Sequence, residues 1–302
     1  PSWLKALHDD LPMNTVPGIH YWEEGRPVCT PKPEWSDPDH CYCISKTFRS
    51  SFPPEITRGC PFACKFCQVS ALFGRHMRHR SPESVWSVIH KGQRFVRFVS
   101  PNAFSYGSHL KGSINYGAIT ELLEGIRRID SHIQIFFGSF PSEVRPEDVT
   151  DESIRIIKQY TNNVALALGA QSGSDRLLNY MNRQHTSQDV FLAIERIHRA
   201  GMQSKVDFIF GLPGENEEDL EITFRFIQQI IPMNSEIRIH TFIPLPGTGF
   251  AHESPGFISP GTRRRLHSLI GKGVASGPWL HKERINQSIS HFIGSHSGEI
   301  YH

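Results

Sequence analysis

The amino-acid sequence predicts an α/β protein whose parallel strands form a partial or full (β/α) barrel. From Pro53 onward, short apolar runs alternate with helical stretches, which is the pattern of successive βα units. One of these runs, residues 164–169, is apolar throughout, as expected for a strand covered on both faces. Six such units in a row favour a barrel, in which functional residues gather in the loops that follow the strands.

The sequence places each element of this barrel in order. We expect six strands, at residues 55–57, 95–99, 133–138, 164–169, 203–210 and 237–243. Helices follow at residues 82–91, 116–129 and 147–160, then between Thr186 and Gly201, after Pro213-Gly214, and at 262–274. Thr186 and Asp189 form a capping-box pattern, and Gly201 is a typical helix stop. Pro82 suits the first turn of a helix.

Two segments flank the predicted barrel core of residues 53–250. Residues 1–52 read as an irregular N-terminal linker, because proline and glycine interrupt them throughout. A hairpin over residues 18–28, turning at Glu24-Gly25, is the one regular feature expected there. Residues 251–302 form a short C-terminal extension. The sequence begins with Pro1 rather than methionine, so we expect a further segment upstream.

Composition narrows the classes of function. A net charge of +2 does not call for a nucleic-acid or membrane partner. No run reaches the ~18 apolar residues that spanning a bilayer requires. Six cysteines in a chain of this size do not make a disulfide scaffold, and three of them lie close together, as metal ligands do. We therefore expect a reducing compartment, the cytoplasm.

The strongest motif is a loop with the spacing Cys60-x3-Cys64-x2-Cys67. Thiolates are the ligands that iron-sulfur clusters favour, and three of them can hold three irons of a cubane. The fourth iron then stays open for another molecule. A zinc site is the alternative, with His76 or His79 completing the ligand set. It is disfavoured because no second Cys-x2-Cys or histidine pair lies at a suitable distance.

This spacing, with the aromatic Phe66 just before the last cysteine, resembles the signature of the radical S-adenosylmethionine (SAM) superfamily. The resemblance covers roughly Pro53 to Gly249. It implies a [4Fe-4S] cluster on the three cysteines, with SAM chelating the open iron. An external donor of the flavodoxin or ferredoxin type supplies an electron, and reductive cleavage of SAM gives a 5′-deoxyadenosyl radical. Phe66 then lies beside the adenine.

The same resemblance assigns SAM contacts in the loops after later strands. Ser100 and Asn102 stand where the superfamily meets the methionine amino group, and an ordinary Pro-Asn turn is the alternative. Gln171 and Ser172 stand near the ribose, in a segment that also offers helix caps. Arg183 is a candidate partner of the SAM carboxylate, against the alternative of a surface arginine.

Three further features bear on the site. Asp207 is the remaining candidate for SAM binding. It lies in the middle of a predicted strand that leads into a Gly-Leu-Pro-Gly turn, so it needs a buried partner and is expected to face the barrel lumen. The basic run from Arg75 to Arg80 is either a solvated surface or a contact for an acidic group. Cys41 and Cys43 fall outside the cluster pattern, and no role is assigned to them.

The subclass rests on resemblance alone. Residues 16–25 look like the connector of cobalamin-dependent radical SAM enzymes, with Pro1–Asp10 as the remnant of a preceding cobalamin domain. The first hypothesis is therefore a methyltransferase acting on an unactivated carbon, with cobalamin as a further cofactor. The alternative is a methylthiotransferase acting on tRNA or protein, since residues 171–186 resemble that group. A non-catalytic iron-sulfur or zinc module is the third. The substrate stays open, a peptide or protein side chain among the candidates.

Overall fold

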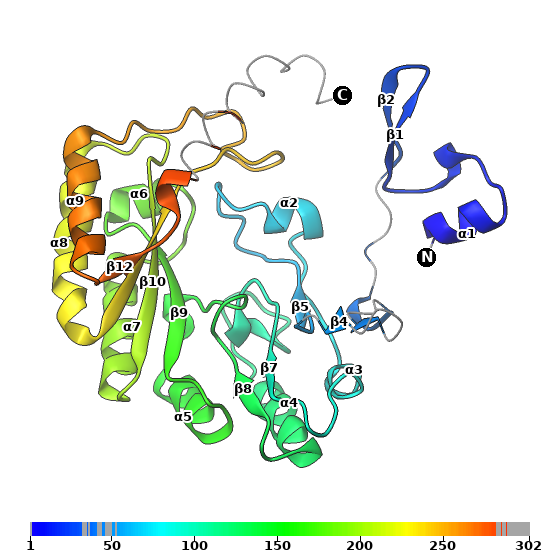
Figure 1. The fold of residues 1–302 in the computed structure, drawn as a ribbon, viewed down its shortest axis with the longest axis horizontal. Coiled ribbons are helices and arrows are strands. Elements are labelled where there is room, and N and C mark those ends of the chain that lie inside the picture. The colour runs from blue at the N-terminus through cyan, green and yellow to red at the C-terminus, as the bar shows by residue number, and fades with distance from the viewer. Residues whose placement is uncertain are drawn as a thin grey trace. The chain divides into compact units, whose positions relative to one another are not determined.

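A computed structural model describes residues 2–31, 35, 37–40, 44–45, 50–51, 53–281, 285 and 288. The chain divides into two compact units, Pro1–Asp37 and Pro38–His302 (Figure 1). Cys41 and Cys43 lie outside the described residues. Among the described helices, none is both long and apolar enough to cross a membrane.

The first unit contains a short helix and one hairpin. Helix α1 (Ser2–His8) is followed by a 3-10 turn at Met13–Thr15 and by the antiparallel strands β1 (His20–Glu23) and β2 (Arg26–Cys29). Glu24 and Gly25 both have positive φ, at 50° and 76°, as a tight two-residue hairpin turn requires. The predicted hairpin and its turn are thereby confirmed.

Parallel strands form the frame of the second unit. The main sheet has the order β12-β11-β10-β9, made of Ala275–Ser276, Ser235–Thr241, Gln203–Phe210 and Ala165–Gln171. Strand β7 (Phe95–Arg97) pairs in parallel with β8 (Gln134–Phe136). Parallel bridges from Glu55 to Val99 and from Val144 to Leu168 extend the series at both sides of this pair. The predicted α/β fold with parallel strands is confirmed.

Two asparagines link β8 to β9 where the regular ladder is interrupted. Asn162 Oδ1 accepts from the backbone N–H of Ile135, and Asn163 Oδ1 accepts from that of Phe137. Asn163 also donates to the carbonyls of Phe137 and Ala165. These side chains satisfy backbone groups that a continuous pair of strands would satisfy directly.

The first strand differs from the prediction. Only the bridge at Glu55 is parallel, whereas β5 (Thr57–Arg58) pairs antiparallel with β6 (Arg78–His79). The cysteine loop turns back on itself, so its two ends pair with each other. A second short antiparallel pair, β3 with β4, consists of Ile44–Ser45 and Ser50–Ser51.

The helices follow the strands as predicted, with several differences in bounds. The larger ones are α4 (Tyr116–Ile129), α5 (Asp151–Tyr160), α7 (Ser187–Arg199), α8 (Glu217–Ile230) and α9 (Pro260–Gly271). The short ones are α2 (Val69–Phe73), α3 (Pro82–Trp86) and α6 (Asp175–Tyr180), with 3-10 turns at Pro38–His40, Ala103–Ser105, Pro146–Asp148 and Ile231–Met233. Helix α5 starts later than expected because Thr150 caps it, and α2 and α6 were not foreseen.

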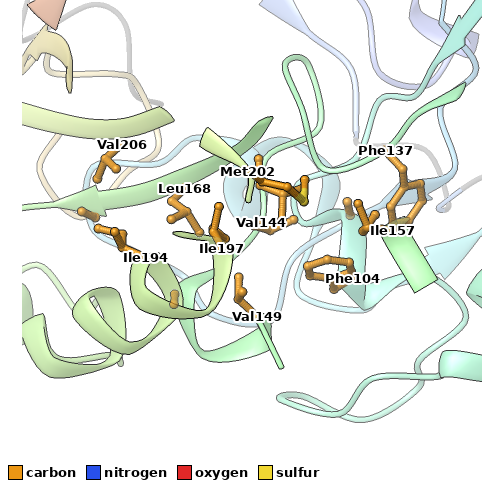
Figure 2. Close-up of a cluster of buried hydrophobic side chains, with 14 of the residues drawn as sticks. Phe104, Phe137, Val144, Val149, Ile157, Leu168, Ile194, Ile197, Met202 and Val206 are labelled. Atoms are coloured by element: carbon orange, nitrogen blue, oxygen red, sulfur yellow. The ribbon is translucent and has the colours of Figure 1, made fainter. Parts of the chain in front are cut away.

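Apolar side chains on the outward face of the strands pack against the helices. Figure 2 shows Leu168 of β9 and Val206 of β10 facing Ile194 and Ile197 of α7, and all four are fully buried. Burying each such side chain contributes about 1.5–3 kcal/mol. Because side chains alternate along a strand, the residues between them point inward, and on β10 and β11 these include Asp207, Arg238 and His240.

Candidate functional site

The cysteine loop connects β5 to α2 and lies at the carboxyl ends of the parallel strands. Cys60, Cys64 and Cys67 line one cavity of about 140 Å³, together with Phe66 and Arg183. Cys64 is buried, and the other two are partly exposed. Three thiols facing one space suit an iron-sulfur cluster, in which each thiolate binds a different iron.

The backbone of this loop is held by the segment that follows α6. Lys65 N–H donates to the carbonyl of Met181 at 3.0 Å. Asn182 Nδ2 donates to the carbonyls of both Phe62 and Ala63 at 3.0 Å. These contacts fix loop carbonyls that would otherwise lack partners, so the residues after Met181 serve to shape the loop.

Arg183 joins this segment to the cysteine loop directly. Its Nη1 lies 3.6 Å from Cys64 Sγ, and its Nη2 donates to the carbonyl of Gly169 at 2.7 Å. Nε has no hydrogen-bond partner among the described residues although it is buried. The arginine is therefore not on the surface, and its Nε–H is a buried donor without a partner among the described residues.

Gln171 reaches the cavity through an irregularity in β9. The pairing of β9 with β10 shifts between Asp207 and Phe208, and Gln171 has a φ of 74°. A β-bulge of this kind changes the direction of a side chain, and a positive φ is uncommon in a residue other than glycine. Gly169 makes room for it, since a Cβ there would lie 2.5 Å from Gln171 Nε2.

Three predicted residues are buried next to the site without lining its cavity. Ser100 Oγ donates to the carbonyl of Asn102 at 2.7 Å, and Asn102 Nδ2 donates to Asp148 at 2.5 Å. Ser172 Oγ pairs with Thr223 of α8 at 3.2 Å. Their side chains connect loops and helices, and a contact with SAM stays a prediction for each.

A second cavity, of about 280 Å³, adjoins the first. Phe66, Glu143 and Gln171 line both. Asp207 and His240 line only the second. The sequence prediction of a lumen-facing Asp207 therefore agrees with its place in the structure.

Asp207 has the partners that its burial requires. Its Oδ2 accepts from Arg238 Nη2 at 2.5 Å, and His240 Nε2 lies 3.0 Å from its Oδ1. Arg238 Nη2 also donates to Glu143 Oε1 at 2.8 Å. Burial opposes ionisation of Asp207, but the hydrogen bonds from His240 and Glu143 and the charge of Arg238 lower its pKa.

Glu143 behaves in the opposite way. Burial and the adjacent charge of Asp207 raise the pKa of Glu143 to about 8. The two carboxyl groups therefore hold one proton between them near neutral pH.

A second arginine, Arg145, contacts both the cysteine loop and the segment around Arg183. The Arg145 guanidinium lies 3.6 Å from the centre of the Phe62 ring, and its Nη2 donates to the carbonyl of Arg183 at 2.5 Å. Arg145 Nε donates to Glu147 Oε1 at 2.5 Å. Burial opposes ionisation of Glu147, but the adjacent His185 ring, with Nδ1 3.4 Å from Glu147 Oε2, and the charge of Arg145 lower its pKa to about 2.

Sequence reasoning did not find Glu143, Arg145, Arg238 or His240. The first two lie in the loop after β8, which is the position where a barrel places functional residues. Arg238 and His240 alternate with Ile237 and Ile239 along β11. Charged residues at every second position of a central strand were the signal that could have revealed them.

The zinc alternative does not agree with the geometry. His79 Nδ1 lies 3.1 Å from Thr57 Oγ1, and its Nε2 lies 2.7 Å from the carbonyl of Ser108, so both ring nitrogens are used. In the described part of the chain, no three His, Cys, Asp or Glu side chains converge on a single metal ion. The cysteines of a [4Fe-4S] cluster do not share one metal ion: each thiolate binds a different iron, so the three sulfur atoms lie further apart than the ligands of a single zinc ion.

The basic run after the cysteine loop is partly structural. Arg80 is buried and donates through Nε to the carbonyl of Glu55 at 2.9 Å. Arg78 Nη2 donates to the carbonyl of Phe73 at 2.6 Å. Neither predicted role, a solvated surface or a contact for an acidic group, describes Arg80, whose side chain holds the backbone of the first strand.

Fold and site together define a parallel α/β barrel protein with three thiols at the carboxyl ends of its strands. The family model of the radical SAM superfamily matches residues 55–227, more than half of the chain, so the chain belongs to this superfamily. Membership implies a [4Fe-4S] cluster and SAM as cofactors.

Relatives by sequence include tRNA-2-methylthio-N(6)-dimethylallyladenosine synthases. The chain is 30% identical to the synthase of Clostridium novyi, and the match covers 58% of this chain and 38% of the synthase. It is also 30% identical to the synthase of Yersinia pseudotuberculosis, and that match covers 71% of this chain and 45% of the synthase. An uncharacterised protein of Methanopyrus kandleri is 26% identical over 67% and 39%. The chain thus spans less than half the length of these three relatives.

Solved structures with a similar fold include two radical SAM enzymes. The radical SAM methyltransferase TsrM from Kitasatospora setae, with cobalamin and a [4Fe-4S] cluster bound, has a TM-score of 0.62 and 15% identity, over 82% of this chain and 50% of TsrM. The cobalamin-dependent enzyme OxsB, with aqua-cobalamin and SAM bound, has a TM-score of 0.59 and 16% identity, over 90% and 37%. At such identities the likeness concerns the fold.

Proposed function

We propose that this chain is the radical-generating part of a cobalamin-dependent methyltransferase that acts on an unactivated carbon. The observation that carries the core of the proposal is the convergence of Cys60, Cys64 and Cys67 on one cavity, beside a second cavity large enough for part of a substrate. The likeness in fold to TsrM and OxsB favours the methyltransferase.

In this proposal the three cysteines hold the cluster. When bound, the cluster supplies the electron that cleaves SAM. Burial raises the pKa of the Cys60 and Cys67 thiols, so both thiols would release their protons on binding iron. Arg183 orients Cys64 through Nη1, and its unpartnered Nε–H is the donor for the carboxylate of SAM.

Phe66 and Gln171 stand between the two cavities, since both residues line each of them. We assign Phe66 to the adenine and the Gln171 amide to a ribose hydroxyl. Asp207 lines only the second cavity, so we assign it to the substrate side rather than to SAM. These residues position the two molecules, and the reactive chemistry belongs to the cofactors.

A methylthiotransferase acting on tRNA or protein is the second candidate. The 30% identity to the two synthases favours it. An external donor of the flavodoxin or ferredoxin type and a cytoplasmic location complete either proposal, because a reduced cluster needs an electron source and a reducing compartment.

Anaerobic reconstitution followed by reduction in the presence of SAM tests the shared part. We expect about four irons per chain and release of 5′-deoxyadenosine. An iron-free protein, or one that never cleaves SAM, would contradict the proposal. The subclass is decided on the full-length gene product. Retained cobalamin favours methyl transfer, and a second cluster of about four irons favours methylthiolation.

A further inference from the structure

The second cavity has one charged wall, built from three separate elements. Glu143 comes from the loop after β8, Asp207 from β10 and His240 from β11. Asp207 is the hidden member, with 4% of its side chain accessible, whereas Glu143 and His240 are 36% and 32% accessible. Asp207 contacts His240 and shares Arg238 with Glu143, and Glu143 and His240 are the more accessible members of this wall.

The charges of this wall do not balance when both carboxyl groups are ionised. Glu143 and Asp207 share a single guanidinium, since Arg238 Nη2 donates to both of them. His240 Nε2 lies 3.0 Å from Asp207 Oδ1 and adds a positive charge only when the ring is protonated. The one permanent positive charge in contact with both carboxylates is therefore that of Arg238.

The other cations near Glu143 have partners of their own. Arg145 is paired with Glu147 at 2.5 Å, and Arg183 is directed to Cys64 and to the carbonyl of Gly169. The charge of Arg183 favours ionisation of Glu143, but burial and the adjacent charge of Asp207 outweigh it and raise the pKa of Glu143 to about 8. A proton on the carboxyl pair then takes the place of a second cation.

The rest of the cavity wall is mainly apolar. Phe66, Ile209, Phe242, Ile243 and Leu245 line it opposite or beside the carboxyl pair. Such a lining buries a hydrocarbon or aromatic stem, while the few polar groups fix its head.

We propose that Glu143 and Asp207 bind a cationic nitrogen of the substrate, an ammonium or guanidinium group carried on an apolar stem. The inference rests on the proposed function, because it takes the second cavity as the substrate site. Binding exchanges one cation for one proton. The O–H bond of the shared carboxyl breaks, the proton leaves to solvent, and the ligand nitrogen keeps its own protons and pairs with two carboxylates.

This exchange gives the binding a defined pH dependence. The groups that face Glu143 are Asp207 of β10, Arg238 and His240 of β11, and Arg183 and Arg145 of the adjoining cavity. The proton exchanged on binding is the one that Glu143 and Asp207 share. Affinity for a cation is therefore expected to rise about tenfold per pH unit below pH 8 and to level off above it.

The test uses the cluster-loaded protein saturated with SAM, with n-pentylammonium as probe and 1-pentanol as its neutral analogue. Calorimetry in two buffers of different ionisation enthalpy measures proton release. We expect about one proton released per bound pentylammonium at pH 7 and none for pentanol. The infrared band of protonated carboxyl groups should weaken on addition of pentylammonium only.

Glu215 offers a matched control. Burial raises its pKa to about 8 as well, and it accepts from Gly211 N–H at 2.7 Å, but it lines neither cavity. Glu215→Gln should keep the response to pentylammonium, and Glu143→Gln should lose it.

Several results would overturn the inference. Equal affinities for the two probes, or a pH-independent affinity for pentylammonium, would do so. Loss of the carboxyl band on addition of SAM alone would assign the pair to SAM instead of the substrate. The proposed function is judged separately by 5′-deoxyadenosine: a protein that cleaves SAM but ignores the cation refutes only this inference, and one that binds the cation without cleaving SAM refutes only the function.

Discussion

The two faces of the parallel strands make different use of the same backbone. The outward face carries Leu168, Val206 and Ile237, which are fully buried against helices. The inward face of the same strands carries Gly169, Asp207 and Arg238. Burial of apolar surface explains the residue types of the outward set, whereas the inward set leaves space for ligands and places charged groups in the barrel. Substitutions at neighbouring positions of one strand should therefore differ in effect, lowering stability on the outward face and activity on the inward face.

Cys64→Ala is expected to have the largest effect on the inward side. Removing one of three thiolates should lower the iron content well below four per chain and abolish 5′-deoxyadenosine formation, because the cluster loses a ligand. Iron analysis and product chromatography measure both. Cys29→Ala is the control, since Cys29 is exposed and lines neither cavity. Unchanged product formation by Cys64→Ala would contradict its assignment.

Leu168→Ala tests the outward face. Its side chain is fully buried, so truncation should lower the free energy of unfolding by about 2–5 kcal/mol. Chemical denaturation of the cluster-loaded protein measures this. At temperatures where the variant is folded, iron content should match that of the unchanged protein. If Leu168→Ala were as stable as the unchanged protein but lacked iron, the proposed difference between the two faces would be wrong.

Gly169→Ala, one residue along the same strand, should behave the other way. The new Cβ would lie 2.5 Å from Gln171 Nε2 and 2.7 Å from Arg183 Nη2, and both are the ends of flexible side chains. They can shift at little cost in stability, but a displacement of about 1 Å in a positioning group can cost about 100-fold in rate. SAM cleavage should therefore fall while the denaturation midpoint changes little. A stability loss as large as that of Leu168→Ala would contradict this.

The last prediction concerns the pH dependence of stability caused by Glu143. Its pKa is about 8 in the folded protein, above its ordinary value, so the folded state binds more protons than the unfolded state between about pH 4.5 and 8. Stability should therefore fall as the pH rises through this window. Glu143→Gln should reduce that fall, as measured by denaturation at several pH values, and an unaltered slope would show that the group is not protonated.

The sequence predicted the secondary structure and the cysteine loop better than it predicted the charged residues of the inward face. Helix α4 and strand β10 have the predicted bounds, because regular apolar periodicity and capping residues mark them locally. The cysteine loop could be recognised because its three cysteines lie within one short segment. Glu143 and His240 are 97 positions apart in the sequence, and no local pattern joins Glu143 to Asp207.

The sequence by itself determined the alternation of strands and helices and the cysteine spacing, since both depend on residues that are near neighbours along the chain. Only the tertiary structure decided that Arg238 is shared by two carboxyl groups and that Arg183 reaches Cys64. Such pairings depend on strand register and on a bulge in β9, which are fixed by packing across the whole sheet. The charge of each group, and hence its chemistry, follows from partners that are distant in sequence.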